Sequence, residues 1–92
     1  MRNIHTSVDL PNGVGRLVLF DWETGSGSDE NLVCLEPNGR VRWRAKLPTN
    51  DPSDCFVAVR LDRDLVRANS WSGYAVRLDP ATGRTLRTQF TK

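Results

Sequence analysis

The sequence contains few of the residues that perform catalytic or metal chemistry. It has one histidine, His5, and two cysteines, Cys34 and Cys55, which lie far apart and form no CxxC pair. A zinc site needs closely spaced cysteine and histidine ligands, so the composition argues against one. His5 has no serine, cysteine or aspartate at a spacing typical of a catalytic motif. We therefore interpret it as a surface residue.

Other patterns of catalysis and ion binding are equally scarce. We find no nucleophile with a nearby base, no paired general acid and base, no phosphate-binding loop and no calcium loop. One Gly- and Ser-rich segment carries or adjoins four acidic residues, namely Asp21, Glu23, Asp29 and Glu30. They offer oxygen ligands for a hard cation, although a solvated loop has the same composition. We predict no catalytic residues, no cofactor and no metal.

Long hydrophobic runs and an excess of charge of one sign are also missing. No stretch approaches the roughly 18 apolar residues of a membrane span, and the N-terminus lacks the apolar run of a signal peptide. We therefore expect a cytoplasmic protein without membrane contact. In a reducing cytosol Cys34 and Cys55 are expected to be small buried side chains, with a disulfide between neighbouring strands as the alternative. The net charge of +2 is too small to indicate nucleic-acid binding by bulk electrostatics.

What the sequence does contain is a succession of short apolar segments with strand-like alternation, separated by turn signals such as Asn38-Gly39. No useful window has the apolar spacing of a helix. The expected strands are residues 4–10, 16–22, 32–35, 40–47, 55–61, 65–70, 74–78 and 85–90. We predict an all-β fold of seven or eight antiparallel strands without significant helix. A chain of 92 residues fits a single domain spanning 1–92.

The alternation of apolar and polar residues is clearest in residues 40–47. Four apolar residues are expected to face the core, namely Val41, Trp43, Ala45 and Leu47. Four basic residues fall on the opposite side, namely Arg40, Arg42, Arg44 and Lys46. Arg60, Arg77 and Arg87 would extend this basic face if their strands were neighbours with the matching pleat. A solvated sheet face protected by charge is the alternative interpretation.

An internal repeat organises the chain. The segments 35–40 and 78–84 share a Leu, an acidic residue, a Pro, a Gly and an Arg, and their leucines, Leu35 and Leu78, are 43 residues apart. Upstream, residues 17–20 align with residues 56–59, so that repeat one spans about 15–47 and repeat two about 55–90. A repeat of about 40 residues built from four short strands is typical of a β-propeller blade.

Residues 74–84 resemble the blade repeat of quinoprotein-like propellers of the pyrroloquinoline-quinone type. In that family an Ala, a Leu-Asp, a Thr-Gly and a basic residue precede a Trp that docks one blade on the next. Repeat two keeps four residues of the pattern, namely Asp79, Thr82, Gly83 and Arg84. Arg77 replaces its Ala and Arg87 its Trp, whereas in repeat one Cys34 takes the small position and Trp43 the docking position. Repeat one lacks the Thr.

The resemblance implies blade-like meanders but no cofactor. Quinoproteins bind their cofactor at the centre of a ring of several blades, and two blades cannot close such a ring. Two blade-like sheets would instead pack as a small sandwich or barrel, or assemble with other copies. A homodimer is one way to cover an open sheet edge.

Two features are candidates for contact with a partner. One is the basic face, represented by Arg42, Arg44 and Lys46; the other is Trp71 and Tyr74, which lie at and just after a turn. Large aromatic residues at turns either cover a core or anchor an interface. We predict a small non-enzymatic protein-binding domain with an acidic protein partner, such as a bacterial immunity or inhibitor protein. The alternatives are a nucleic-acid-binding module and a fragment of a larger propeller.

Overall fold

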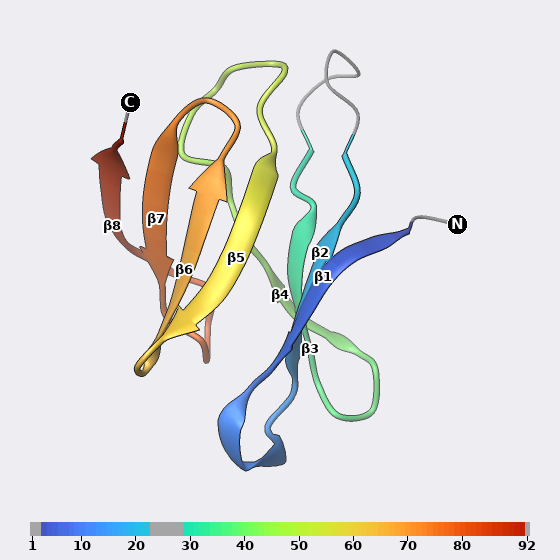
Figure 1. Cartoon of the computed structure of the whole chain (residues 1–92). Coiled ribbons are helices and arrows are strands. Elements are labelled where there is room, and N and C mark those ends of the chain that lie inside the picture. The colour runs from blue at the N-terminus through green and yellow to red at the C-terminus, as the bar shows by residue number, and fades with distance from the viewer. Residues whose placement is uncertain (1–2, 23–28, 92) are drawn as a thin grey trace.

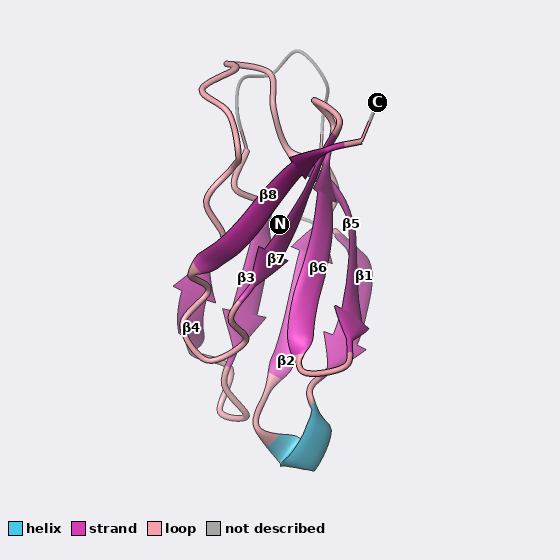
Figure 2. Cartoon of the chain, turned by 90° about the vertical axis from the view of Figure 1, so that its left-hand side faces the viewer, coloured by secondary structure: helices cyan, strands magenta, loops and turns pink. Residues whose placement is uncertain are grey.

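The computed structural model, which describes residues 3–22 and 29–91, contains two antiparallel sheets of four strands each (Figure 1). Sheet one consists of β1 (Ile4–Asp9), β2 (Arg16–Phe20), β3 (Leu32–Leu35) and β4 (Val41–Arg44). Sheet two consists of β5 (Phe56–Asp62), β6 (Leu65–Ser70), β7 (Tyr74–Leu78) and β8 (Thr85–Phe90). One short 3-10 turn, Pro11–Gly13, follows β1 (Figure 2). The predicted all-β fold is confirmed, and no helix among the described residues is long and apolar enough to cross a membrane.

Each sheet is a meander in which every strand pairs with the next strand along the chain. The first four-stranded unit therefore begins with β1 at Ile4, and not near residue 15 as the repeat suggested. By position in the sheet, β2 corresponds to β6, so the alignment of residues 17–20 with residues 56–59 in β5 is wrong by one strand. The correspondence of β3 with β7, which rests on Leu35 and Leu78, agrees with the strand order.

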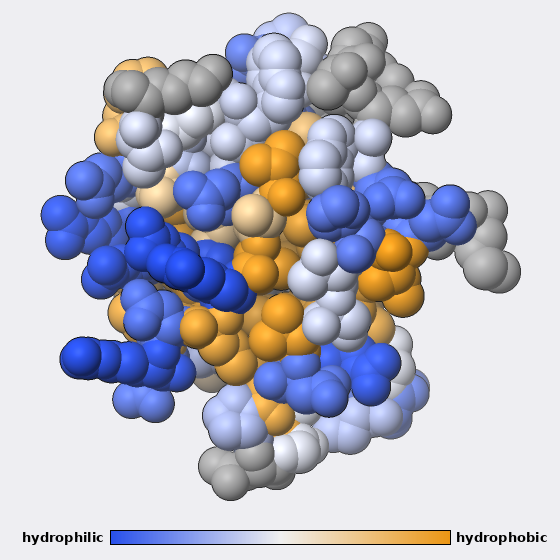
Figure 3. Space-filling view, in the orientation of Figure 1, coloured by the Kyte–Doolittle hydropathy of each residue, from blue (hydrophilic) through white to orange (hydrophobic). Residues whose placement is uncertain are grey.

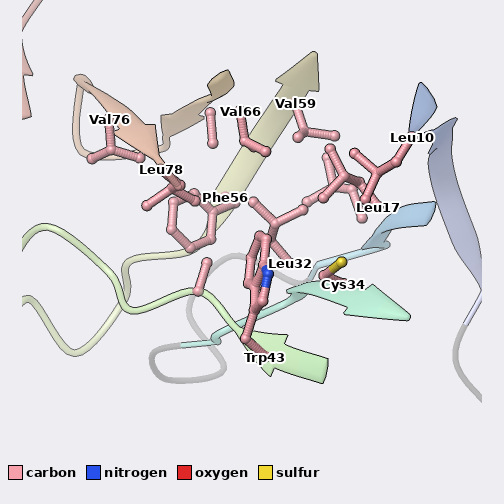
Figure 4. Close-up of a cluster of buried hydrophobic side chains, with 13 residues drawn as sticks. Leu10, Leu17, Leu32, Cys34, Trp43, Phe56, Val59, Val66, Val76 and Leu78 are labelled. Carbon is pink, nitrogen blue, oxygen red and sulfur yellow. The ribbon is translucent and has the colours of Figure 1, made fainter. Parts of the chain in front are cut away.

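The two sheets enclose one hydrophobic core (Figure 4). Sheet one contributes the fully buried Leu17, Leu19 and Cys34, and sheet two contributes Val66 and Leu78. In β6 the buried residues alternate with more exposed ones, as a period of two requires, whereas β2 and β3 each bury three consecutive residues and are therefore covered on both faces. Apolar atoms reach the surface along the line where the sheets meet in the view of Figure 1 (Figure 3). The packing is that of a small β-sandwich.

A β-bulge in β4 changes which residues face the core. Cys34 pairs with Trp43 and Leu35 pairs with Val41, so Arg42 is an extra residue without an opposite partner. Such an insertion shifts the alternation by one position. Val41, expected in the core, is 53% exposed, whereas Trp43 is buried as predicted. The expectation for Val41 was wrong because the simple alternation of residues 40–47 ignored this bulge.

Trp43 joins the two sheets at the β7–β8 turn. Its indole Nε1 donates a hydrogen bond of 2.9 Å to the carbonyl oxygen of Pro80. Its ring lies against Gly83, which has a φ of +73°. A Cβ atom built on Gly83 would lie 2.5 Å from the Trp43 ring. The turn therefore needs glycine for two reasons, a left-handed backbone and the close approach of the indole.

Gly83→Ala should destabilise the protein more than Gly39→Ala. Gly39 also has a positive φ, of +89°, but a Cβ there would meet no atom within 4 Å. Both variants incur backbone strain of about 1 kcal/mol, and only Gly83→Ala adds the clash with Trp43. Urea unfolding of both variants measures the difference. Equal losses of unfolding free energy would contradict a tight Trp43–Gly83 contact.

Two buried polar side chains complete the connections between segments. Asn31 accepts a hydrogen bond from the Phe56 amide at 2.8 Å and donates to the carbonyls of Phe20 at 2.9 Å and Phe56 at 2.8 Å. It thereby links sheet one to the start of sheet two. The Asp54 carboxylate is fully buried and accepts hydrogen bonds from Thr49, Cys55 and Ser72. Among the described residues, no buried side-chain polar atom lacks a partner.

Candidate protein-binding face

Four arginines form a row across the outer face of sheet two. Arg60 pairs with Arg67, Arg67 with Arg77, and Arg77 with Arg87, so that each of the four strands contributes one arginine. We call these four residues the arginine row. Because directly paired residues of neighbouring strands point to the same face, the four side chains project side by side. Figure 2, in which sheet two lies in front of sheet one, looks toward this face.

The row is accessible to solvent. Arg60, Arg77 and Arg87 are exposed and Arg67 is half-buried between its neighbours. Long hydrophilic side chains extend from this side of the molecule in Figure 3. In the described part of the chain, none of the four guanidinium groups forms an ion pair or a side-chain hydrogen bond. Like charges directly opposite each other destabilise a sheet, so the row carries a cost to folding.

The equivalent row of sheet one shows how unusual this arrangement is. Its members pair in the same order across β1 to β4, and all are apolar: Val8, Leu17, Cys34 and Trp43. That row packs into the core against sheet two. In sheet two the corresponding side of the sheet carries four arginines and faces water. A position that is core in the first unit has thus become a charged surface in the second.

The residues predicted from the 40–47 segment do not form one basic face. Arg42 is half-buried, donates a hydrogen bond of 2.6 Å to the Val14 carbonyl and lies with Pro80 and Leu61 in the cleft at the ends of both sheets. Arg44 pairs across the sheet with Val33 and donates to the Glu30 carbonyl at 3.0 Å. Lys46 is exposed beyond the end of β4. The bulge therefore separates Arg42 from Arg44.

The basic face also does not extend as expected. Arg60, Arg77 and Arg87 belong to sheet two, whereas residues 41–44 form an edge of sheet one, so they are not neighbouring strands. The three arginines instead meet Arg67, which sequence reasoning did not single out. The signal that could have found it is its place in the alternation of residues 65–70, where Val66 and Ala68 are buried on the other side.

The predicted aromatic residues lie at one end of sheet two. Trp71, in the β6–β7 turn, is 47% exposed and its amide donates to the Cys55 carbonyl at 2.8 Å. Tyr74 is half-buried, and its ring lies 5.0 Å from that of Phe90. Tyr74 is separated from the arginine row because it lies three positions before Arg77 along β7. Both residues lie at the end of sheet two that is away from the arginine row, and the structure does not bring them together with the basic residues.

Comparisons with known proteins place the fold in a family. Residues 2–90 match the family described as a domain of unknown function, DUF7957. The chain belongs to the DUF7957 family. Neither the curated proteins nor the solved structures gave a match.

The described part of this DUF7957 domain shows no cluster of three or more residues able to hold a metal ion. Of the acidic residues considered for a cation, Glu23 lies outside the described residues. His5 is exposed as expected, with its ring 4.8 Å from that of Trp22 and its Nδ1 3.4 Å from a carboxylate oxygen of Asp21.

The two cysteines of the DUF7957 domain are free and buried. Burial raises the pKa of the Cys34 thiol above its ordinary value of 9.0, and nearby Arg42 opposes this shift. Burial, together with the charges of Asp54 and Asp29, raises the pKa of the Cys55 thiol. The expected small buried side chains are confirmed, and the alternative of a disulfide is wrong.

Both thiols should react slowly with iodoacetamide in the folded protein. The thiolate is the nucleophile, and a raised pKa keeps each thiol protonated at pH 8 and shifts its ionisation to higher pH. Mass spectrometry after brief alkylation should find almost no adduct in buffer and two adducts per chain in concentrated urea. Rapid double alkylation without urea would contradict the burial of these residues.

Proposed function

We propose that this chain is a non-catalytic binding protein that attaches to an acidic protein surface through its arginine row. The observation that carries the proposal is the pairing of Arg60, Arg67, Arg77 and Arg87 across all four strands of sheet two. Arginine suits such a role because its planar guanidinium binds carboxylates with two parallel hydrogen bonds and is weakly hydrated. It is also enriched at protein interfaces.

The loss of folding stability caused by the arginine row supports a role in binding. Each arginine lies directly opposite another, an arrangement that lowers stability in the free protein. A partner that brings carboxylates to the row would remove this repulsion and gain charge-assisted hydrogen bonds. The contrast with the apolar row of sheet one adds weight, because the same positions accept hydrophobic residues in this fold.

We further propose that the two sheets are blade-like repeats of the quinoprotein-like type, a relation supported by the contact of Trp43 with Pro80 and Gly83. A protein that binds without chemistry acts by occupying its partner's surface. A cytoplasmic immunity or inhibitor protein that blocks an acidic surface is the role that fits this binding mode.

Nucleic acid is the second candidate ligand, because the same guanidinium groups would attract phosphates. Single-stranded nucleic acids are usually held by basic residues interleaved with exposed aromatic rings. The residues beside the arginine row are instead Ala58, Asn69, Ala75 and Gln89, and Trp43 is buried in the core. These neighbours favour a protein ligand.

The test compares two double variants in pull-down experiments with lysate of the native host. Arg67→Gln with Arg77→Gln removes two charges from the arginine row, whereas Arg40→Gln with Lys46→Gln removes two exposed charges from the sheet-one side. We expect one acidic protein to be captured by wild type and by the second variant, and to be lost with the first. The proposal would be overturned if both variants captured the same protein equally well. It would also be overturned if treatment of the lysate with nuclease abolished the capture.

A further inference from the structure

We infer that the ligand of the arginine row is an acidic α-helix lying across the strands of sheet two. The inference rests on the proposed function, since it specifies the shape of the acidic surface. It follows from the spacing of the four charges, from their neighbours on the same face, and from the charges at its margins.

The spacing of the arginine row matches the repeat of a helix. Neighbouring strands lie about 4.8 Å apart, so a row with one arginine on each of four strands spans about 14 Å from first to last. An α-helix presents one residue per turn on a given side, with a pitch of about 5.4 Å and hence about 16 Å over three turns. Four carboxylates at helical positions i, i+4, i+7 and i+11 therefore each meet one arginine.

An extended peptide fits the row less well. Its residues on one side repeat every second position, about 6.7 Å apart, and four of them span about 20 Å. The arginine row and the helix differ in length by only about 2 Å over three intervals, and flexible arginine side chains can compensate for this difference. The mismatch with a strand is about three times larger, and it moves the outer carboxylates beyond the ends of the row.

The surroundings of the row leave room for a helix on one side. The next row on the outer face consists of Ala58, Asn69, Ala75 and Gln89, which are small or neutral. A shallow hollow lies at this row, lined by Ala58, Asn69, Arg60 and Arg67. Asp62, two residues beyond Arg60, pairs with Leu65 on the opposite side of the row and would repel carboxylates. The helix is thus expected to lie over the arginine row and the neutral row.

Two peptides of identical composition test the inference. Both are fluorescein-labelled 20-residue peptides of alanine, glutamine and four glutamates, and both carry a covalent link between two side chains four positions apart, which enforces a helix. The first places glutamate at i, i+4, i+7 and i+11 and so forms one stripe. The second places glutamate at alternate positions, which distributes the charges around the helix. Fluorescence anisotropy at low ionic strength measures their affinities for the full-length protein.

We expect the striped peptide to bind at least about tenfold more tightly than the alternating peptide. Arg67→Gln with Arg77→Gln should abolish this preference, while Arg40→Gln with Lys46→Gln should keep it. Unlinked versions of both peptides, in which glycine and serine replace alanine and lower the helix propensity, serve as an extended probe.

Other outcomes separate the two proposals. If the unlinked alternating peptide binds as tightly as the linked striped peptide, and binding needs Arg67 and Arg77, the helix is wrong and the acidic protein surface stands. If a 12-nucleotide single-stranded DNA binds more tightly than every peptide, both proposals fail. If no peptide binds and the pull-down still recovers an acidic protein through the arginine row, the helix inference alone is overturned.

Discussion

A variant with Arg60→Val, Arg67→Leu, Arg77→Val and Arg87→Trp is expected to assemble into large head-to-tail oligomers. These substitutions give the outer face of sheet two the apolar character of the equivalent row in sheet one, which packs into the core. Four large exposed apolar side chains side by side form a patch that soluble monomers rarely tolerate. The arginine row would thus be what ends the stacking of sheets after the second.

The other half of the new interface is already present on sheet one. Its outer face carries the half-buried Leu35, which corresponds by position to Leu78, a residue that sheet two packs against sheet one; Val33 beside it is already buried. Val41 on the same face is 53% exposed. Contact between two different faces leaves each copy with one face free, so association continues from copy to copy until a ring closes or a filament forms.

Light scattering after size-exclusion chromatography tests this prediction. The variant should form species of many times the chain mass of 10.4 kDa, and circular dichroism should still show a β-rich fold. Replacing the same four arginines by glutamine provides the matched control, because it removes the charge without adding apolar surface, and its elution should equal that of wild type. If the apolar variant elutes like the glutamine variant, the arginines do not limit stacking.

Asn31→Ala is expected to lower the unfolding free energy by about 3 kcal/mol or more. The substitution removes three hydrogen bonds and leaves the buried amide and carbonyl of Phe56 without their side-chain partner. A buried backbone group left unsatisfied costs about 1–3 kcal/mol. Small domains are stable by only about 5–15 kcal/mol, so this loss is a large fraction of the total.

Thermal unfolding measures the effect, with a decrease in Tm of more than about 10 °C expected. Asn50→Ala is the matched control, since Asn50 is exposed in the loop between the sheets and should change Tm little. Asn31→Asp adds a second comparison, because it keeps the acceptor but loses the amide donor to two carbonyls. A Tm of Asn31→Ala close to that of Asn50→Ala would show that Asn31 does not join the sheets.

The residues that stabilise the sandwich differ from the residues that are proposed to bind a partner. Trp43 and Asn31 connect the sheets through contacts that no partner needs, so their loss should affect stability before binding. The arginine row has the opposite profile: glutamine there should weaken partner binding while relieving repulsion between like charges. Measuring stability and binding on the same variants therefore distinguishes the two kinds of residue.

The amino-acid sequence by itself determined the strands, the turns and the absence of recognisable catalytic motifs. Alternating apolar residues and turn signals such as Asn38-Gly39 act locally, so strands β3, β6, β7 and β8 were predicted with their observed bounds. The burial of Trp43 also followed from this alternation.

Only the tertiary structure decided which side chains share a face across strands. Arg42 has no opposite residue in β3 and therefore forms a bulge. The bulge separates Arg42 from Arg44, and it turns the side chain of Val41 toward solvent. Arg67 joins Arg60, Arg77 and Arg87 because of the register of four strands that are distant in sequence. The physical reason is that alternation specifies sides within one strand, whereas a shift of one residue in pairing moves a side chain to the opposite face.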